Sequence, residues 1–288
     1  TGPAEPWAGV REMIGREIQA KRIPSVSLAV IKDGGIVWEE AFGLADLENR
    51  VEATPRTVYP IASVTKPFTA TAIMILAERG LVDLDRPAGA YLPQGSLKAF
   101  EGDVAGVTIR RLLQHTSGLA MYWDFYFEGA SRPRPPLETV LRRYAIVVAP
   151  PGGDYNYSNL GYAVLESVIE RVSGRSYPDF MTTEVFRPLG LSRTEVLTSP
   201  PDWPDASRKY GPSLAPIPFC DHTTRGASAI HATAHDLASF LLLHLRRLRP
   251  DQKPILQPRS IDVMRTARDP DVRFSSYALG WETGRRFG

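Results

Sequence analysis

The spacing of the hydrophobic residues changes along this 288-residue chain, and the change limits the folds that the chain can adopt. Residues 6–21 have helical spacing, whereas residues 25–42 alternate like a β-hairpin around the turn residues Asp33–Gly35. From Ser63 to about residue 190 the spacing is mostly helical, and a mixed pattern follows. This order predicts an α/β (α+β) protein in which a mostly helical domain is inserted into an α/β domain.

Capping residues mark where several of the expected helices begin and end. Thr108 can cap a short helix, and Asn159 can cap a helix over residues 160–172 that ends at Gly174. Thr233 begins a further helix in a sequence that is similar to a capping box. Residues 197–218 are rich in proline and are typical of a surface loop.

The composition argues against several classes of protein. A net charge of +2 gives no reason to expect a nucleic-acid partner. Cys220 is the only cysteine, so the chain has no internal disulfide. No apolar run approaches the length of a membrane span. We therefore expect neither a nucleic-acid partner nor a membrane-spanning segment. The expected partner is a small-molecule or peptide substrate.

The sequence Ser63–Lys66 reads S-x-x-K and comes directly before Pro67, a residue tolerated in the first turn of a helix. The spacing therefore places Ser63 at a helix start and Lys66 one turn later on the same face. A cation is disfavoured there, so the pKa of Lys66 is expected to be lowered. A serine beside such a lysine is a candidate nucleophile. About one S-x-x-K arises by chance in a chain of this length, so a helix start with an exposed lysine is the alternative.

A turn-rich segment over residues 150–159 brings Tyr157 and Asn159 to the start of the next expected helix. In an extended segment two such side chains point the same way. A tyrosine near a lysine can have a lowered pKa and act as a base, and an asparagine can hold a lysine or a substrate carbonyl. The alternative is an aromatic core anchor followed by a helix cap.

The sequence Leu112–Leu119 contains His115 and Ser117, which could be mistaken for a catalytic Ser/His pair. The sequence Thr116–Gly118 is typical of a helix end whose side chains bond the local backbone. We therefore interpret His115 as a residue that binds backbone groups beneath the site.

Taken together, these stretches resemble the serine β-lactamase and penicillin-binding-protein superfamily, in the branch that contains class C β-lactamases, D-amino-acid peptidases and β-lactamase-like esterases. The matching motifs read S-V-T-K-P-F-T-A, L-L-Q-H-T-S-G-L and P-G-G-x-Y-x-Y-S-N-L-G-Y. The resemblance extends from about Val10 to Trp281.

The resemblance implies a β-lactamase/transpeptidase-like fold, an antiparallel sheet flanked by helices with an inserted, mostly helical domain. Residues 1–62 and 222–288 would form the sheet domain, and residues 63–221 would form the helical domain. By the same resemblance Ser63 is the acylated nucleophile, and its backbone N–H is one oxyanion donor. Lys66 is its activating partner, Tyr157 is the general base and acid, and Asn159 orients the substrate and Lys66. No metal or other cofactor is implied.

The family also has a third motif, K-T-G, H-x-G or W-G-G, on a strand shortly after the position of Trp281. Glu282–Gly284 is similar to K-T-G only superficially, because glutamate has the wrong charge and comes too soon. Residues 284–288 look like the lead-in to the missing strand. We therefore expect the printed sequence to be cut short, and a chain that ended at Gly288 to be inactive.

The substrate stays open among a β-lactam, a D-amino peptide and a carboxylic ester. The apolar run that contains Trp123 and Phe125 is either loop packing or a wall beside Ser63 that binds substrate. The wall would favour hydrophobic esters. The resemblance favours an extracytoplasmic location and leaves a cytoplasmic one possible.

Three other functions fit the sequence less well. A GxSxG hydrolase is excluded, because Gly226–Ile230 lacks the second glycine. A zinc enzyme is disfavoured, because His231 and His235 lack the glutamate of H-E-x-x-H. An inactive binding or scaffold protein on the same fold is the remaining alternative.

Overall fold

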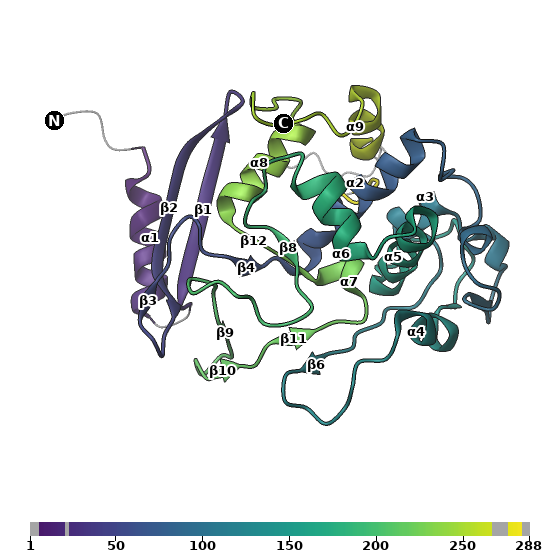
Figure 1. Ribbon diagram of the computed structural model, residues 1–288, viewed down its shortest axis with the longest axis horizontal. Helices are drawn as coiled ribbons and strands as arrows, with labels where there is room; N and C mark the ends of the chain where they lie inside the picture. Colours follow the sequence, from purple (N-terminus) through teal and green to yellow (C-terminus); the bar gives the residue numbers. More distant parts are fainter. Residues whose placement is uncertain (1–5, 21–22, 267–275, 284–288) are drawn as a thin grey trace.

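Residues 6–20, 23–266 and 276–283 are described by a computed structural model. They form helices and small, mostly antiparallel sheets, which confirms the expected fold class. In Figure 1 the N-terminal sheet lies on one side of the molecule, and most of the helices are gathered beside it.

The helical elements are α1 (Ala8–Gln19), the 3₁₀ turn η1 (Ala62–Val64), α2 (Thr65–Glu78), η2 (Ala88–Tyr91), η3 (Val104–Gly106), α3 (Ile109–Leu113), α4 (Leu137–Tyr144), α5 (Asn159–Ser173), α6 (Tyr177–Phe180), the π-helix η4 (Met181–Phe186), α7 (Arg225–Ser228), α8 (Ala234–His244) and α9 (Pro258–Arg265). The strands are β1 (Ser25–Lys32), β2 (Gly35–Asp46), β3 (Val51–Glu52), β4 (Tyr59–Pro60), β5 (Lys98–Ala99), β6 (Tyr126–Phe127), β7 (Ile146–Val147), β8 (Glu195–Val196), β9 (Lys209–Tyr210), β10 (Pro216–Ile217), β11 (Cys220–Asp221), β12 (Ile230–Ala232), β13 (Ser276–Tyr277) and β14 (Glu282–Thr283).

The N-terminal sheet has the order β1-β2-β3, with Ser25 opposite Gly43 in the antiparallel β1–β2 pair. The turn between them has Asp33 at φ 52° and Gly34 at φ 83°. Positive φ at both residues suits a two-residue hairpin turn. The predicted hairpin is therefore confirmed. Helix α1 packs on β2, while α8 packs on β1 and β2 from the opposite side (Figure 1).

Helix α2 lies at the centre of the helical part, and its residues Thr65–Leu76 are all buried. A helix without an exposed face needs neighbours on every side. Those neighbours include α5, α7, α9 and η4. Gly80, at φ 70°, follows the last turn in the left-handed conformation that glycine adopts readily. Consequently, the segment that begins at Ser63 is held rigidly by the core.

The other predicted caps are confirmed with one correction. The Oγ1 of Thr108 accepts the N–H of Arg111 at 3.2 Å, and Thr233 caps α8 in the same way. Helix α5 is capped by Ser158, whose Oγ accepts the N–H of Gly161 at 3.0 Å. The prediction that Asn159 caps this helix is therefore wrong by one residue. Asn159 is the first helical residue, and its amide binds a lysine.

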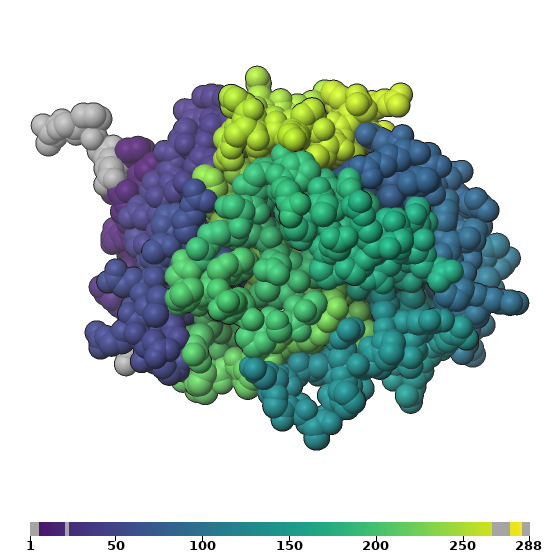
Figure 2. Space-filling model, viewed as in Figure 1, coloured from purple at the N-terminus to yellow at the C-terminus, as the bar shows by residue number. Residues whose placement is uncertain are grey.

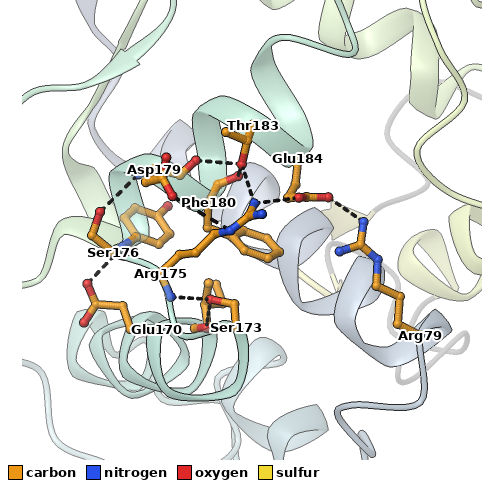
Figure 3. Close-up of polar contacts among 11 residues, drawn as sticks. Arg79, Glu170, Ser173, Arg175, Ser176, Asp179, Phe180, Thr183 and Glu184 are labelled. Atoms are coloured by element: carbon orange, nitrogen blue, oxygen red, sulfur yellow. Dashed lines mark hydrogen bonds and ion pairs between the residues drawn. The ribbon is translucent and has the colours of Figure 1, made fainter.

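Ion pairs tie the end of α2 to the π-helix η4 (Figure 3). The Nη1 of Arg175 donates to Glu184 at 2.8 Å and to Thr183 at 2.9 Å, and Glu184 also pairs with Arg79, the residue that follows α2. Arg79 and Arg175 are about half exposed, so each pair alone contributes little. Sharing of Glu184 by two arginines links α2, η4 and the segment after α5.

The division of the chain into residues 1–62 with 222–288 and residues 63–221 stays a prediction. Residues 284–288, which were expected to lead to the third motif, lie outside the described residues. Across residues 6–20, 23–266 and 276–283, no helix is both long enough and apolar enough to cross a lipid bilayer.

The turn between β13 and β14 packs directly on α2. The N–H of Ala278 donates to the carbonyl of Trp281 at 2.7 Å, and Gly280 between them has φ 82°. A Cβ on Gly280 would lie only 2.5 Å from the Cβ of Ala70 and 3.3 Å from the carbonyl oxygen of Lys66. Glycine is therefore required by both the backbone conformation and the close approach.

We expect Gly280→Ala to lower the free energy of unfolding by about 2–5 kcal/mol, because left-handed strain adds to steric overlap. Gly174→Ala is the matched control. Gly174 also has a left-handed φ, 69°, but no atom lies within 4 Å of its Cβ position. The control should lose only about 1–2 kcal/mol. Urea unfolding of both variants measures the difference, and equal losses would contradict the close packing on α2.

Candidate active site

Ser63 is exposed in η1, the tight turn that leads into α2. The first backbone N–H groups of a helical segment have no acceptor within the helix, so the N–H of Ser63 is suited to bind a substrate oxygen. Ala62 has φ 46°, a conformation that disfavours any side chain. Strain of this kind is concentrated at functional sites.

Lys66 is buried, with only 1% of its surface exposed. Its Nζ lies 3.2 Å from the Oγ of Ser63, 2.8 Å from the Oδ1 of Asn159 and 3.1 Å from the carbonyl oxygen of Ala227. Burial lowers the pKa of Lys66 to about 7. The predicted direction of this shift is confirmed, although its cause is desolvation and not the end of the helix.

Tyr157 lies on the other side of the serine. Its hydroxyl donates to the Oγ of Ser63 at 2.7 Å. Burial raises the pKa of Tyr157, and the hydrogen bond to Ser63 offsets this only in part. The expectation of a lowered pKa is therefore wrong. The Nζ of Lys66 lies over the ring, 4.6 Å from its centroid, and its hydrogen bonds go to Ser63, Asn159 and Ala227.

The side chain of Asn159 faces the same point as that of Tyr157. Its Oδ1 accepts from Lys66, while its Nδ2 donates weakly to the carbonyl of Tyr122 at 3.4 Å. The orientation of the Asn159 amide is thus fixed by one hydrogen bond at its oxygen and one at its nitrogen. The structure therefore brings Ser63, Lys66, Tyr157 and Asn159 together from η1, α2 and the start of α5.

His115 supports this group from below, as predicted. Its Nδ1 accepts the backbone N–H of Ser158 at 3.0 Å. Burial, with a smaller effect of the charge of Lys66, lowers the pKa of His115 to about 3, so the ring is neutral. It packs against Tyr157 with ring centroids 4.4 Å apart. The His115 ring thereby fixes the position of the Tyr157 ring.

Helix α7 supplies a contact to the site that no sequence motif indicated. Gly226 lies so close to α5 that a Cβ would come within 2.8 Å of the carbonyl oxygen of Tyr162. Its N–H donates to the carboxyl of Glu166 at 2.7 Å, and its carbonyl accepts from Thr69 at 2.6 Å. These bonds aim the next carbonyl, that of Ala227, at Lys66. The one feature of the sequence that could have indicated this contact is Glu166, a carboxyl residue in an otherwise apolar stretch.

Ser63 lines a cavity of about 280 Å³. Trp123 and Phe125 form part of its wall, with 61% and 45% of their surfaces exposed. Lys209, His222 and His231 also line it. Sequence reasoning missed these three as cavity residues, because Lys209 lies in a proline-rich stretch and no local motif marks the others. Figure 2 shows the projecting loop that contains β6 beside the segment that contains β10 and β11.

The aromatic segment is held in place by one carboxylate. Asp124 accepts hydrogen bonds from the hydroxyls of Tyr122 and Tyr126 and pairs with Arg132 at 3.1 Å. Tyr126 is buried, whereas Trp123 and Phe125 alternate with these anchored residues and stay exposed. The segment therefore both packs as a loop and forms cavity wall, because Tyr122 and Asp124 line the cavity together with Trp123 and Phe125.

Within residues 6–20, 23–266 and 276–283 no three His, Cys, Asp or Glu side chains are grouped to hold a metal ion. His235 pairs with Glu39 at 2.8 Å, and the Nδ1 of His231 lies 3.3 Å from the carbonyl of Ala229. The two histidines are therefore engaged separately.

The model of the Beta-lactamase family matches residues 10–288, nearly the whole chain. The chain belongs to the Beta-lactamase family. Unguisins hydrolase ungD' of Aspergillus campestris is 29% identical over 94% of this chain and 54% of its own length. The chain spans about half the length of the curated relatives that it matches.

Solved structures show the same fold. The octameric penicillin-binding protein homologue from Pyrococcus abyssi has a TM-score of 0.79 at 27% identity, and the match covers 96% of this chain and 65% of that one. EstCE1, a hydrolase with promiscuous acyltransferase activity, has a TM-score of 0.78 at 24% identity. That match covers 95% of this chain and 81% of the EstCE1 chain. At this low identity the second match bears on the fold alone.

The buried Lys66 predicts a pH-dependent stability. Its pKa is about 7 in the folded state, below the ordinary value of 10.5 that holds in the unfolded chain. Between these values the unfolded state binds more protons, so stability rises with pH. Relative to Lys66→Met, the wild type should gain roughly 3–4 kcal/mol between pH 7 and pH 10. Urea unfolding across this range measures the difference, and a gap that stays constant would contradict the lowered pKa.

Proposed function

We propose that this protein is a serine hydrolase that cleaves an amide or ester through an acyl intermediate on Ser63. One observation carries the proposal. The Oγ of Ser63 lies within hydrogen-bond reach of a buried lysine with a pKa near 7 and of a protonated tyrosine. This combination activates a hydroxyl without a histidine.

The contacts of Lys66 define the direction of proton transfer. The oxygens of Asn159 and Ala227 can only accept, so they take the two N–H bonds of a neutral amine. The lone pair of the nitrogen then faces the hydroxyl of Ser63. Since Tyr157 donates to the same Oγ, the serine proton is directed toward Lys66. Lys66 is therefore our candidate for the base in acylation.

In the proposed reaction the Oγ of Ser63 attacks the substrate carbonyl as its proton passes to Lys66. The new ammonium keeps both carbonyl contacts and lies over the ring of Tyr157, which favours a cation. Tyr157 then gives its proton to the leaving group. In deacylation the tyrosinate takes a proton from the attacking water, and the ammonium of Lys66 returns its proton to the Oγ of Ser63 as the acyl–oxygen bond breaks. The N–H of Ser63 would stabilise the oxyanion, and the donor expected from the third motif falls outside the described residues.

Tyr157 has a different role here from the one that the resemblance implied. A phenol with a raised pKa keeps its proton near pH 7, so it serves first as a donor. The role of general base in acylation passes to Lys66. Asn159 retains its predicted role of orienting Lys66.

The comparisons support a hydrolase in general terms, since one relative is named a hydrolase and one structural neighbour a penicillin-binding protein homologue. An inactive binding protein on this fold is the alternative. The complete hydrogen-bonded arrangement around Ser63 favours an enzyme, because a binding protein has no need of a buried, neutral lysine. An extracytoplasmic location stays a prediction from the resemblance.

Covalent labelling tests the nucleophile. A fluorophosphonate probe should label the protein once, and Ser63→Ala should abolish the label. Ser228→Ala is the matched control, because Ser228 lines the same cavity but makes no contact with Lys66. The control should be labelled like the wild type. Labelling of Ser63→Ala at the wild-type level, read by gel fluorescence and mass spectrometry, would refute the assignment.

For the substrate, the cavity wall favours hydrophobic carboxylic esters over D-alanyl-D-alanine peptides. Trp123→Ala should raise KM for p-nitrophenyl butyrate about ten-fold and lower kcat less, since the ring supplies apolar contact and no proton. Phe100→Ala, a change at an 86% exposed residue outside the cavity, should alter neither constant. A cephalosporin hydrolysed far faster than any ester would replace the esterase interpretation with a β-lactamase one.

A further inference from the structure

Lys209 lies where two cavities meet. The cavity of about 280 Å³ contains Ser63, and a second cavity of about 530 Å³ is lined by residues including Trp203, Arg208 and Phe219. Two residues, Lys209 and His231, line both. They therefore form the boundary between the reaction cavity and the larger space beside it. Lys209 is the first residue of β9. Figure 1 shows β9 among the short strands that also include β10 and β11.

The charge of Lys209 has no counter-ion in either cavity. Burial lowers the pKa of Lys209, and the only group that opposes this shift is the thiol of Cys220. Among the described residues no carboxylate forms an ion pair with it. A partly buried ammonium without an anion is unfavourable, so the site is suited to an anion supplied from outside.

The acids that line the two cavities do not neutralise Lys209. Asp46 pairs with Arg208 at 2.6 Å, and Asp124 is occupied by Arg132 and two phenols. Glu128 lines the larger cavity but is exposed and makes no ion pair with Lys209. Lys66, the buried lysine beside Ser63, already has three oxygen partners of its own.

The neighbouring imidazoles leave the ammonium as the dominant charge. Burial lowers the pKa of His231 to about 4 and also lowers the pKa of His222, so both rings are neutral near pH 7. The Nδ1 of His231 is directed at the carbonyl of Ala229, so its N–H donates a hydrogen bond to that oxygen. The Nε2 is then an acceptor that can take an N–H or O–H of a bound molecule.

We propose that Lys209 binds a carboxylate that the substrate carries at a distance from the carbonyl attacked by Ser63. This inference rests on the proposed function of Ser63 and names a class of substrate for it. Lys209 lines the second cavity whereas Ser63 does not, so the carboxylate lies at the passage with a linking chain toward the serine. A single ammonium matches one negative charge, which favours a carboxylate over a phosphate dianion. The larger cavity would hold any part of the substrate that extends beyond the carboxylate.

Two pairs of esters test the proposal, because the carboxylate can be on the acyl side or on the leaving side. Mono-p-nitrophenyl glutarate is compared with p-nitrophenyl valerate, and 4-acetoxybenzoate with its methyl ester. In at least one pair the wild type should prefer the anionic member. Lys209→Met should lower kcat/KM for that member about ten-fold or more, mainly through KM, and leave the neutral member within about two-fold. Lys209→Glu should reverse the preference.

Lys98→Met is the matched control, since Lys98 is an exposed lysine that lines neither cavity. It should behave like the wild type with every ester. Unchanged turnover of the neutral esters by the Lys209 variants also shows that they are folded.

The two proposals fail in different ways. If no ester is turned over and Ser63 is not labelled, the proposed function fails. If the neutral esters are turned over but neither pair shows a preference that depends on Lys209, the carboxylate site is refuted. Calorimetry in Ser63→Ala protein gives an answer that does not depend on turnover. There Lys209→Met should weaken binding of the preferred anionic ester about ten-fold, and equal binding would also refute the site.

Discussion

The buried amino group of Lys66 is the constraint on which the rest of the site depends. In the part of the chain that the structure describes, no carboxylate forms an ion pair with Lys66, and two carbonyl oxygens from distant parts of the sequence receive its N–H bonds instead. Helices α2, α5 and α7 must therefore meet at one nitrogen atom. The close approach of Gly226 to α5 and the burial of α2 both allow the three helices to pack this closely. Stability is given up locally so that one amine can lose its proton near neutral pH.

The side chains packed against Lys66 include the rings of Tyr157 and Tyr162, which carry no charge that could balance an ammonium. Around His115 are grouped Tyr155, Tyr157, Tyr162 and Tyr277, whose ring centroids lie 4.4–5.7 Å from its own. Neutral rings exclude water without offering a fixed negative charge. The contrast with the opposite wall is clear, because there a lysine, two imidazoles and exposed aromatic side chains face open space. One wall is suited to proton transfer and the other to recognition.

The sequence predicted well what depends on neighbours in the chain. The hairpin, the cap at Thr108 and the grouping of Ser63 with Lys66 follow from spacing within a few residues, and all are found in the structure. Contacts between residues far apart in the sequence were harder to predict. The carbonyl of Ala227, 161 positions from Lys66, belongs to a backbone that any residue would supply. Burial also reversed the expected pKa shift of Tyr157, since desolvation is a property of packing and not of motif.

Glu166 adds a second buried ionisable group with the opposite preference. Burial raises the pKa of Glu166 to about 8, whereas that of Lys66 is about 7. Below the lower value the core contains an ammonium, and above the higher value it contains a carboxylate. Only between the two are both groups uncharged, with the Glu166 carboxyl still receiving the N–H of Gly226 that sets α7 in place. Ionisation of Glu166 would therefore limit the working range of the protein on its alkaline side, through the framework of the site, and protonation of Lys66 would limit it on its acid side, through the base.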